Sequence, residues 1–220
     1  MSPIIGITTC NPAYEALAIE AARRFRHYTG CDCIILTAND GGFDLMLEAV
    51  RVAHGRVFCL FDADLWFIRH TSLDQFIGME GLAAVADPAA LHDTFCRRDA
   101  ETIGFLPERY VNTGLIFANS ADSRVILAFD RASVMHAEKK AGLWGTIEDH
   151  TEQSILNAAL HEQGLPTQFL PQAWNVYTHA ARYNHVDTLP AQPITIHAAG
   201  VPLDKKMHRL GLECATFEYR

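Results

Sequence analysis

Two carboxylates separated by one residue, Asp62 and Asp64, follow an apolar run in the stretch 56–67, RVFCLFDADLWF. Alternate residues of an extended chain point to the same side, so we expect both carboxylates to face one way at the end of a strand. No basic residue stands within three positions of the pair, and two unpaired carboxylates repel each other unless a cation lies between them. Hard oxygen ligands favour Mg²⁺ or Mn²⁺. The stretch therefore predicts a divalent-metal site, although a strand followed by an acidic turn has the same pattern.

Further residues whose side chains could bind a ligand or take part in a reaction lie downstream of this pair. The triplet Asn-Thr-Gly at 112–114 interrupts an apolar run, where a glycine indicates close approach of a ligand or of backbone. Asp149 and Gln153 are four residues apart and would share a helix face. Asn175 follows an aromatic residue, and His197 ends an apolar segment. These groups follow the acidic pair in a fixed order along the chain.

The elements that would position these groups follow from the apolar spacing. Segments 3–9, 31–37 and 57–61 read as strands, and the last of them is unbroken enough to be covered on both faces. Two amphipathic helices lie between them, the first opening at Asn11-Pro12 and ending at Gly30. Short links between alternating strands and helices imply parallel strands with right-handed crossovers. The acidic pair would then lie at the carboxyl edge of an open sheet, where such folds bind ligands.

The second half of the chain is less regular. A strand is expected at 82–86, another at 110–117 that is interrupted at 112–114, and short late strands at 167–170 and 194–197. Ser120 is expected to cap a helix. Segment 89–109 has no clean period and is expected to be a lid or binding loop that contributes to acceptor choice. No linker or repeat is apparent, so residues 1–220 are expected to form a single domain.

Composition narrows the function classes. The chain has 220 residues, 49% of them hydrophobic and 20% charged, as expected for a globular protein. A net charge of −8 argues against a nucleic-acid partner. The six cysteines fit no zinc pattern and are expected to be buried, reduced thiols. We expect no signal peptide, no transmembrane segment and a cytoplasmic location.

In this order, the motifs FDADLWF, VNTGLIFAN, EQSILN and IHAAG resemble those of the GT-A fold glycosyltransferases, in particular the retaining family of glycogenin and the bacterial galactosyltransferases (glycosyltransferase family 8-like). The resemblance runs from Ile4 to about Lys206. It implies an α/β GT-A (Rossmann-like) nucleotide-diphospho-sugar transferase fold, with a mixed, mostly parallel sheet flanked by helices. The implied activity is retaining transfer of a sugar from a nucleotide-diphosphate sugar, expected to be a UDP-sugar, to a carbohydrate, lipid or protein acceptor.

The same resemblance implies a metal ion held by Asp62, Asp64 and His197. A nitrogen ligand suits Mn²⁺ better than Mg²⁺, and the metal would act as a Lewis acid on the departing diphosphate. The residues expected to bind the nucleotide sugar lie after the early strands, at the acidic pair and near the C-terminus: Thr8, Thr9, Tyr14, Asp62, Asp87, Gly200, Lys205 and Lys206. The tyrosine ring would stack on the uracil base. Leu203 stands where the family has a lysine, so one of the two lysines would reach back to the diphosphate.

The catalytic group implied by the resemblance centres on Gln153, which matches the family glutamine near the anomeric carbon. Its neutral amide is a poor nucleophile, so a front-face route with the leaving diphosphate as base is expected. Glu152 stands where the family has aspartate and is expected to bind sugar hydroxyls, as is Asp87. Asn112 would hold the donor sugar or the acceptor. Asp149, on the face of Gln153, completes the expected group.

Two other functions remain open at this point. A haloacid-dehalogenase-type phosphatase also carries D-x-D after a hydrophobic strand and would use Asp62 as its nucleophile. That class places the motif on the first strand of its domain, whereas two strand-helix units precede it here. The other alternative is a non-catalytic nucleotide-sugar-binding domain.

Overall fold

The computed structural model describes residues 2–39, 43–91, 95–102, 104, 107–140, 151–178 and 192–218. Its centre is a six-stranded sheet in the order β2-β1-β3-β6-β5-β7. The strands are β1 (Ile4–Cys10), β2 (Asp32–Thr37), β3 (Val57–Asp62), β5 (Leu82–Ala86), β6 (Val111–Asn119) and β7 (Thr167–Leu170). β6 runs antiparallel to both of its neighbours, and the other neighbouring pairs are parallel. The mixed, mostly parallel sheet expected from the resemblance is confirmed.

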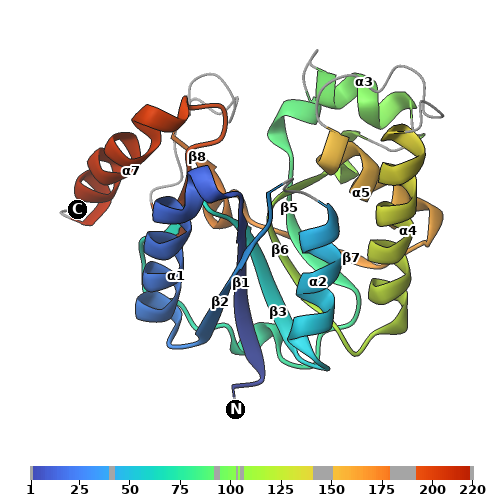
Figure 1. The fold of residues 1–220 in the computed structure, drawn as a ribbon, viewed down its shortest axis with the longest axis horizontal. Coiled ribbons are helices and arrows are strands. Elements are labelled where there is room, and N and C mark those ends of the chain that lie inside the picture. Colours follow the sequence, from blue (N-terminus) through green and yellow to red (C-terminus); the bar gives the residue numbers. More distant parts are fainter. Residues whose placement is uncertain are drawn as a thin grey trace.

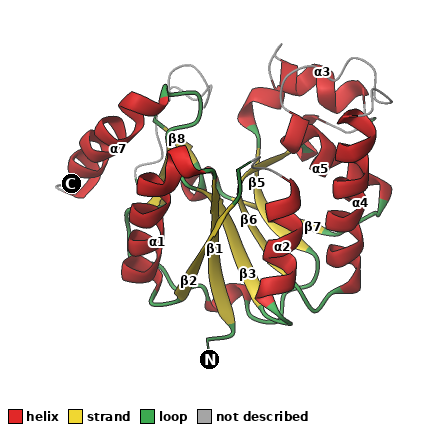
Figure 2. Cartoon of the chain, in the orientation of Figure 1, coloured by secondary structure: helices red, strands yellow, loops and turns green. Residues whose placement is uncertain are grey.

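Helices cover both faces of this sheet (Figures 1 and 2). On one face, α1 (Glu15–Thr29) and α7 (Leu203–Glu218) belong to the same hydrophobic cluster. On the other face lie α2 (Phe43–Ala53), α4 (Ser123–Lys140) and α5 (Thr151–Glu162). α3 (Phe95–Thr102) contacts α5. None of the described helices combines the length and the apolar character needed to cross a membrane.

A second, smaller sheet extends from the end of β3. It consists of β4 (Leu65–Phe67), β9 (Thr195–His197) and β8 (Val176–Tyr177), in the order β4-β9-β8. The chain turns at 63–64 between β3 and β4, and β4 then pairs antiparallel with β9. The expectation that one extended strand carries both carboxylates is therefore wrong, because the backbone of 65–67 finds its hydrogen-bond partners in β9 rather than in the central sheet.

The first helix ends where the sequence predicts, whereas a 3₁₀ turn occupies its predicted start and α1 itself begins at Glu15. The Asn11 side chain accepts a hydrogen bond of 2.9 Å from the backbone N–H of Ala13, and a 3₁₀ turn over Pro12–Tyr14 leads into α1. Gly30 ends the helix in the left-handed conformation with φ 72°, which glycine adopts without steric cost. The buried face of α1 consists of the residues predicted from helical spacing: Leu17, Ala18, Ala21, Ala22 and Phe25.

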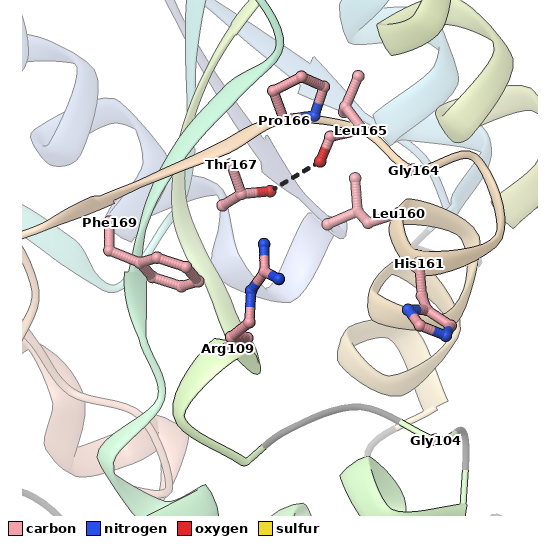
Figure 3. A pocket seen from close by; sticks show the side chains of 9 residues that line it. All are labelled: Gly104, Arg109, Leu160, His161, Gly164, Leu165, Pro166, Thr167 and Phe169. Carbon is pink, nitrogen blue, oxygen red and sulfur yellow. Dashed lines mark hydrogen bonds between the residues drawn. The ribbon is translucent and has the colours of Figure 1, made fainter.

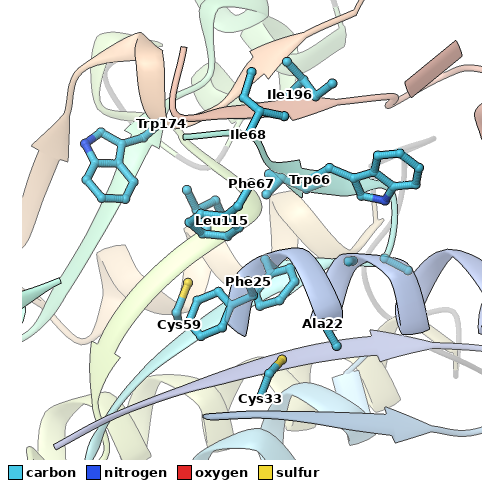
Figure 4. Close-up of a cluster of buried hydrophobic side chains, with 14 of the residues drawn as sticks. Ala22, Phe25, Cys33, Cys59, Trp66, Phe67, Ile68, Leu115, Trp174 and Ile196 are labelled. Atoms are coloured by element: carbon cyan, nitrogen blue, oxygen red, sulfur yellow. The ribbon is translucent and has the colours of Figure 1, made fainter. Parts of the chain in front are cut away.

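Phe25 anchors α1 on the sheet (Figure 4). Its ring stacks on Phe61 of β3 at 5.2 Å and meets Phe67 of β4 edge-on at 5.1 Å. Gly6 of β1 lies beneath the ring, and a Cβ at that position would come within 2.5 Å of it. One aromatic side chain thus joins α1, the central sheet and the small sheet. It contacts both strands that flank the turn at 63–64.

Cysteines line the same core. Cys10, Cys31, Cys33, Cys59 and Cys214 are free thiols, and all but Cys31 are buried. Burial raises the pKa of Cys33 to about 12, which keeps the thiol protonated and unreactive at neutral pH.

β6 is one strand from Val111 to Asn119, but its pairing with β5 is interrupted where the sequence predicts: Ala84 pairs with Ile116 and Ala86 with Val111, so residues 112–115 stand opposite a single residue of β5. Two local predictions for the second half need correction. Segment 89–109 contains α3, whose mixed charges obscure a helical period. Ser120 does not cap α4: its hydroxyl donates to the Arg56 carbonyl, and Asp122 instead accepts from a backbone N–H in the first turn.

Candidate functional site

The acidic pair and the late histidine meet at the junction of the two sheets. Leu65 of β4 lies opposite His197 of β9, and the Asp64 carbonyl accepts a backbone hydrogen bond of 3.0 Å from Ala198. This pairing brings Nε2 of His197 to 3.3 Å from an oxygen of Asp62 and 3.4 Å from an oxygen of Asp64. One ligand atom from each of the three residues lies within 4.8 Å of the others. The structure thus brings the three predicted metal ligands together.

Gly114 explains how the imidazole fits. A Cβ at this position of β6 would lie 2.5 Å from Cε1 and 2.9 Å from Nδ1 of His197. The sequence predicted that this glycine marks a close approach, and the approaching group is a side chain of the site rather than a ligand or backbone. The ring therefore packs directly on β6, at the glycine two residues after Asn112.

Lys206 supplies a positive charge that the local sequence lacks. Its ammonium group pairs with Oδ2 of Asp64 and donates a hydrogen bond of 2.9 Å to the Ala198 carbonyl. It also lies 5.6 Å from the centre of the Tyr14 ring. The inference that only a bound cation could relieve the repulsion between the carboxylates is therefore wrong, because α7 brings a lysine to Asp64 from far along the chain.

The charged groups of this cluster shift the pKa values of Asp64 and His197. Burial alone would raise the pKa of Asp64, but the charge and hydrogen bond of His197, together with those of Lys206, hold that pKa well below its usual range. Burial alone would lower the pKa of His197, but Asp64 and Asp62 outweigh it and raise the pKa to about 9. The lowered pKa of Asp64 and the raised pKa of His197 are therefore two results of one attraction between the carboxylates and the imidazole.

The donor set fits a divalent cation. Two carboxylate oxygens and one imidazole nitrogen converge, and the side chain of Asp62 is 47% exposed, so one side of the cluster faces solvent. Nδ1 of His197 lies 3.0 Å from Oδ1 of Asn175, which is the outer hydrogen bond usual for a metal-bound histidine. A nitrogen together with two carboxylates is a donor set suited to Mn²⁺.

A second polar group lies beside this cluster. Oδ2 of Asp87, which follows β5, accepts hydrogen bonds of 2.7 Å from Nε2 of Gln153 and 3.0 Å from Nδ2 of Asn112. Oε1 of Gln153 accepts a hydrogen bond of 3.1 Å from the backbone of Thr113. The structure thus brings three of the residues predicted to act on the sugar into direct contact, and all three are buried.

Of the two acidic residues predicted beside Gln153, Glu152 lies among the described residues. Glu152 is exposed at the start of α5. Protein atoms that displace water from its carboxyl raise its pKa, and the negative charge of Asp62 raises it further. Asp149 lies outside the described residues. Glu152 is therefore near enough to Asp62 to be affected by its charge.

The residues predicted to hold the nucleotide diphosphate take different positions. Thr8 is fully buried, and its hydroxyl has no hydrogen-bond partner among the described residues. Thr9 and Tyr14 are partly exposed, and Gly200 occupies a turn after β9 with φ 72°.

Of the two candidate lysines, only Lys206 joins the carboxylate cluster. Lys205 is exposed on α7, because successive helical residues point in different directions. Asn175 has no role among the sequence predictions. The sequence shows only that it follows Trp174, because its contact with His197 depends on strand pairing that the sequence does not reveal.

A separate cavity of about 410 Å³ lies between α5 and β7 (Figure 3). The side chain of Arg109 points into it, toward Thr167 and Leu160. Thr167 pairs with Leu82 at the start of β5, whereas Asp87 follows the end of that strand. The cavity is therefore distinct from the carboxylate cluster.

Comparisons with known proteins agree with this architecture. A scan against protein-family models and a search of curated proteins give no match. Among solved structures, the apo form of WbbM, a bifunctional glycosyltransferase, matches with a TM-score of 0.61 at 12% identity, over 99% of this chain and 52% of WbbM. This chain thus spans about half the length of WbbM.

Two further structures match over almost their whole length. The galactosyltransferase LgtC, in complex with donor and acceptor sugar analogues, matches with a TM-score of 0.58 at 14% identity, over 94% of this chain and 95% of LgtC. A glycosyltransferase involved in the glycosylation of the major capsid of PBCV-1 matches with a TM-score of 0.60 at 11% identity, over 95% and 98%. The chain has the GT-A fold of these glycosyltransferases, as the resemblance implied.

Proposed function

We propose that this protein is a metal-dependent glycosyltransferase that moves a sugar from a UDP-sugar to an acceptor with retention of configuration. The observation that carries the proposal is the convergence of Asp62, Asp64 and His197 at the edge of a GT-A sheet, directly beside the Asp87–Asn112–Gln153 group. A metal with room for diphosphate oxygens would thus stand next to hydrogen-bonding groups suited to a sugar. We assign Mn²⁺ as the metal because one ligand is a nitrogen.

The roles of the protein's own residues follow from their positions. When bound, the metal would serve as a Lewis acid for the departing diphosphate. Lys206, which pairs with Asp64, would turn its charge to a diphosphate oxygen. Thr8, Thr9 and Tyr14, together with Gly200, are proposed to hold the uridine diphosphate, and Lys205 is a weaker candidate because it points to solvent.

The sugar would be held by the carboxylate and amides beside the metal site. The side chains of Asp87 and Asn112 are already hydrogen-bonded to each other in a buried network. A sugar hydroxyl that binds there would replace one of the hydrogen bonds of this network rather than displace a water molecule. Gln153 would lie near the anomeric carbon, as the corresponding glutamine does in the family. Replacement of a glutamine by glutamate is an active-site mutation in LgtC. Glu152 and Asp149 stay in this proposal as sugar-binding carboxylates.

The fold argues against one of the two alternative functions and leaves the other open. The acidic pair follows the third strand along the chain and lies beside the antiparallel β6, which is not the arrangement expected of a haloacid-dehalogenase-type phosphatase. A non-catalytic nucleotide-sugar-binding domain would have the same site and differs only in turnover. The cytoplasmic location and the single-domain organisation stay predictions.

The experiment that tests the proposal is a thermal-shift panel of nucleotide sugars with Mn²⁺ or with chelator, followed by an assay of UDP release from the stabilising donor. A ligand that binds only the folded state raises the melting temperature by mass action. We expect stabilisation and UDP release to require Mn²⁺ and to be lost in Asp64→Asn. Asp130→Asn, which changes an exposed aspartate on α4, is the matched control.

The outcomes separate the functions. Equal UDP release in chelator and in Mn²⁺ would remove the metal from the scheme. Mn²⁺-dependent binding without any release, to acceptor or to water, would indicate a binding domain. Proton NMR of the anomeric signal in the first product formed would decide retention against inversion.

A further inference from the structure

The polar side chains behind the carboxylate pair form one chain of hydrogen bonds whose direction can be assigned. A carboxylate only accepts hydrogen bonds, whereas an amide has one accepting and one donating end. Asp87 accepts through Oδ1 from the backbone of Ala89 at 2.9 Å, and through Oδ2 from the side chains of Gln153 and Asn112. The amide nitrogen of Asn112 therefore points toward Asp87.

The other end of Asn112 is fixed independently. Its Oδ1 accepts a hydrogen bond of 3.0 Å from the backbone N–H of Gly114, a group that can only donate. Its Nδ2 has a second acceptor in the hydroxyl of Tyr177. A flipped Asn112 would place its oxygen against a carboxylate and its nitrogen against an N–H, so one orientation is strongly preferred.

This orientation determines that of Asn175. Its Nδ2 lies 2.6 Å from Oδ1 of Asn112, which is an acceptor, so Nδ2 donates. Its Oδ1 then faces Nδ1 of His197 at 3.0 Å and can only accept. The Nδ1 atom of His197 must therefore carry a proton, and Nε2 is the ring nitrogen that faces Asp62 and Asp64.

Because these side chains are buried, reversing an amide would cost free energy. Asn175 is 1% exposed, His197 is 3% exposed and Asn112 is 5% exposed, so water does not readily replace a lost partner. Leaving a buried donor or acceptor unpaired costs about 1–3 kcal/mol. A reversed amide would leave more than one such group unpaired, since each member of the chain has its partner fixed by the next.

We infer that Asn175 is a positioning residue that holds the Nδ1–H of His197, so that Nε2 is the nitrogen presented to a metal at Asp62 and Asp64, and that Asn112 fixes the direction of Asn175. This inference rests on the proposed metal-dependent function. Removal of such outer partners of metal-bound histidines costs about 10–100-fold in metal affinity or activity. The hydrogen bonds of the Asn175 side chain among the described residues go to Asn112 and His197, so its effect on a metal would pass through the imidazole.

The test uses the full chain with ¹⁵N-labelled histidine and begins without metal. We expect the Nδ1–H proton of His197 to be visible by NMR and in slow exchange with water in the natural protein. In Asn175→Leu, which has nearly the same shape but no acceptor, the signal should be lost. Rapid exchange of this proton in the natural protein, or an unchanged signal in Asn175→Leu, would overturn the inference. Asn175→Ala replaces the leucine variant if that one does not fold.

Metal affinity is the second readout, measured with Mg²⁺ or Mn²⁺ alone by calorimetry. We expect Asn175→Leu to weaken binding about 10–100-fold, and to have no further effect in a His197→Ala background. An equal loss in both backgrounds would show a merely structural role. Tyr177→Phe is the matched control, because it removes one hydrogen bond to Asn112 while Asp87 and Gly114 still fix the amide; we expect its metal affinity to change less than about threefold.

The two readouts distinguish the inference from the function on which it rests. If the natural protein binds no metal, the proposed function fails, yet the Nδ1–H signal still decides whether Asn175 holds the ring. If metal binds tightly in Asn175→Leu, the proposed function stands and the positioning role is refuted.

Discussion

Gly114→Ala is the substitution that tests most directly whether strand packing builds the site. The added Cβ would lie 2.5 Å from Cε1 and 2.9 Å from Nδ1 of His197, and 3.0 Å from Oδ1 of Asn112. Non-bonded carbon atoms prefer a separation of about 3.5–4.0 Å, so the ring must withdraw by roughly 1 Å. His197 is buried and tied to Asn175, so it cannot swing away as an exposed side chain would.

The expected magnitude has two parts. Overpacking a well-filled interior costs about 1–3 kcal/mol, which should appear as a lower free energy of unfolding in urea. Metal-ligand distances are held within about 0.2 Å of their preferred values, so a displacement of the ring by roughly 1 Å should weaken Mn²⁺ binding at least as much as removal of its hydrogen-bond partner. We expect a loss of affinity of more than about tenfold by calorimetry.

Gly211→Ala is the matched control. Gly211 lies within α7, and a Cβ there would meet nothing within 4 Å. Replacement of a glycine by alanine inside a helix stabilises by roughly 0.5–1 kcal/mol, so this variant should be slightly more stable and bind Mn²⁺ normally. In a His197→Ala background, Gly114→Ala should lose most of its destabilising effect, because the clashing ring is absent.

Two results would contradict the packing of His197 on Gly114. If Gly114→Ala unfolds at the same urea concentration as the natural protein and binds Mn²⁺ with the same affinity, the ring does not pack on this strand as described. A destabilisation that persists undiminished in the His197→Ala background would place the clash elsewhere.

Three further outcomes are expected. A metal must displace a proton from His197, whose pKa is raised to about 9. Mn²⁺ affinity should therefore rise about tenfold per pH unit below that value and level off above it. Calorimetry at several pH values would give the same affinity throughout if the imidazole is not a ligand. Lys206→Met removes one of the two positive partners of the buried Asp64 carboxylate, and His197 remains as the other. The free energy of unfolding should therefore fall by less than the cost of an uncompensated buried charge, which is about 3–5 kcal/mol, with part of the loss recovered on adding Mn²⁺; equal urea midpoints for variant and natural protein would contradict this. Gln153→Ala should lower kcat for UDP release more than it raises KM, and a change in KM alone would make Gln153 a binding residue only.

The parts of the fold that the sequence predicts are those with a local signal. Helical spacing identifies the buried face of α1, and a glycine in the left-handed conformation identifies its end. The alternation of strands and helices up to Asp62 gives the parallel half of the sheet, because crossover connections leave few topologies. These features depend on residues within one or two elements of each other.

The parts that the sequence does not predict depend on distant pairing. β4 has three residues and β8 has two, too few for any periodic signal, yet they form the small sheet that carries His197 to the acidic pair. Lys206 reaches Asp64 across 142 positions, and only the packing of α7 reveals which of two adjacent lysines points inward. Of the site, the motifs that resemble those of the glycosyltransferases predicted which three residues, Asp62, Asp64 and His197, would converge. The amide chain through Asn175 depends on donor and acceptor geometry that no motif encodes.

The pairing of β4 with β9 has a consequence for the order of assembly during protein synthesis. The acidic pair leaves the ribosome more than a hundred residues before the strand that ends in His197. Domains form progressively from the N-terminus as the chain emerges, so the growing polypeptide holds the acidic pair without its histidine and lysine partners while that intervening segment is made. The cluster of Asp62, Asp64, His197 and Lys206 can therefore assemble only after β9 and α7 have emerged.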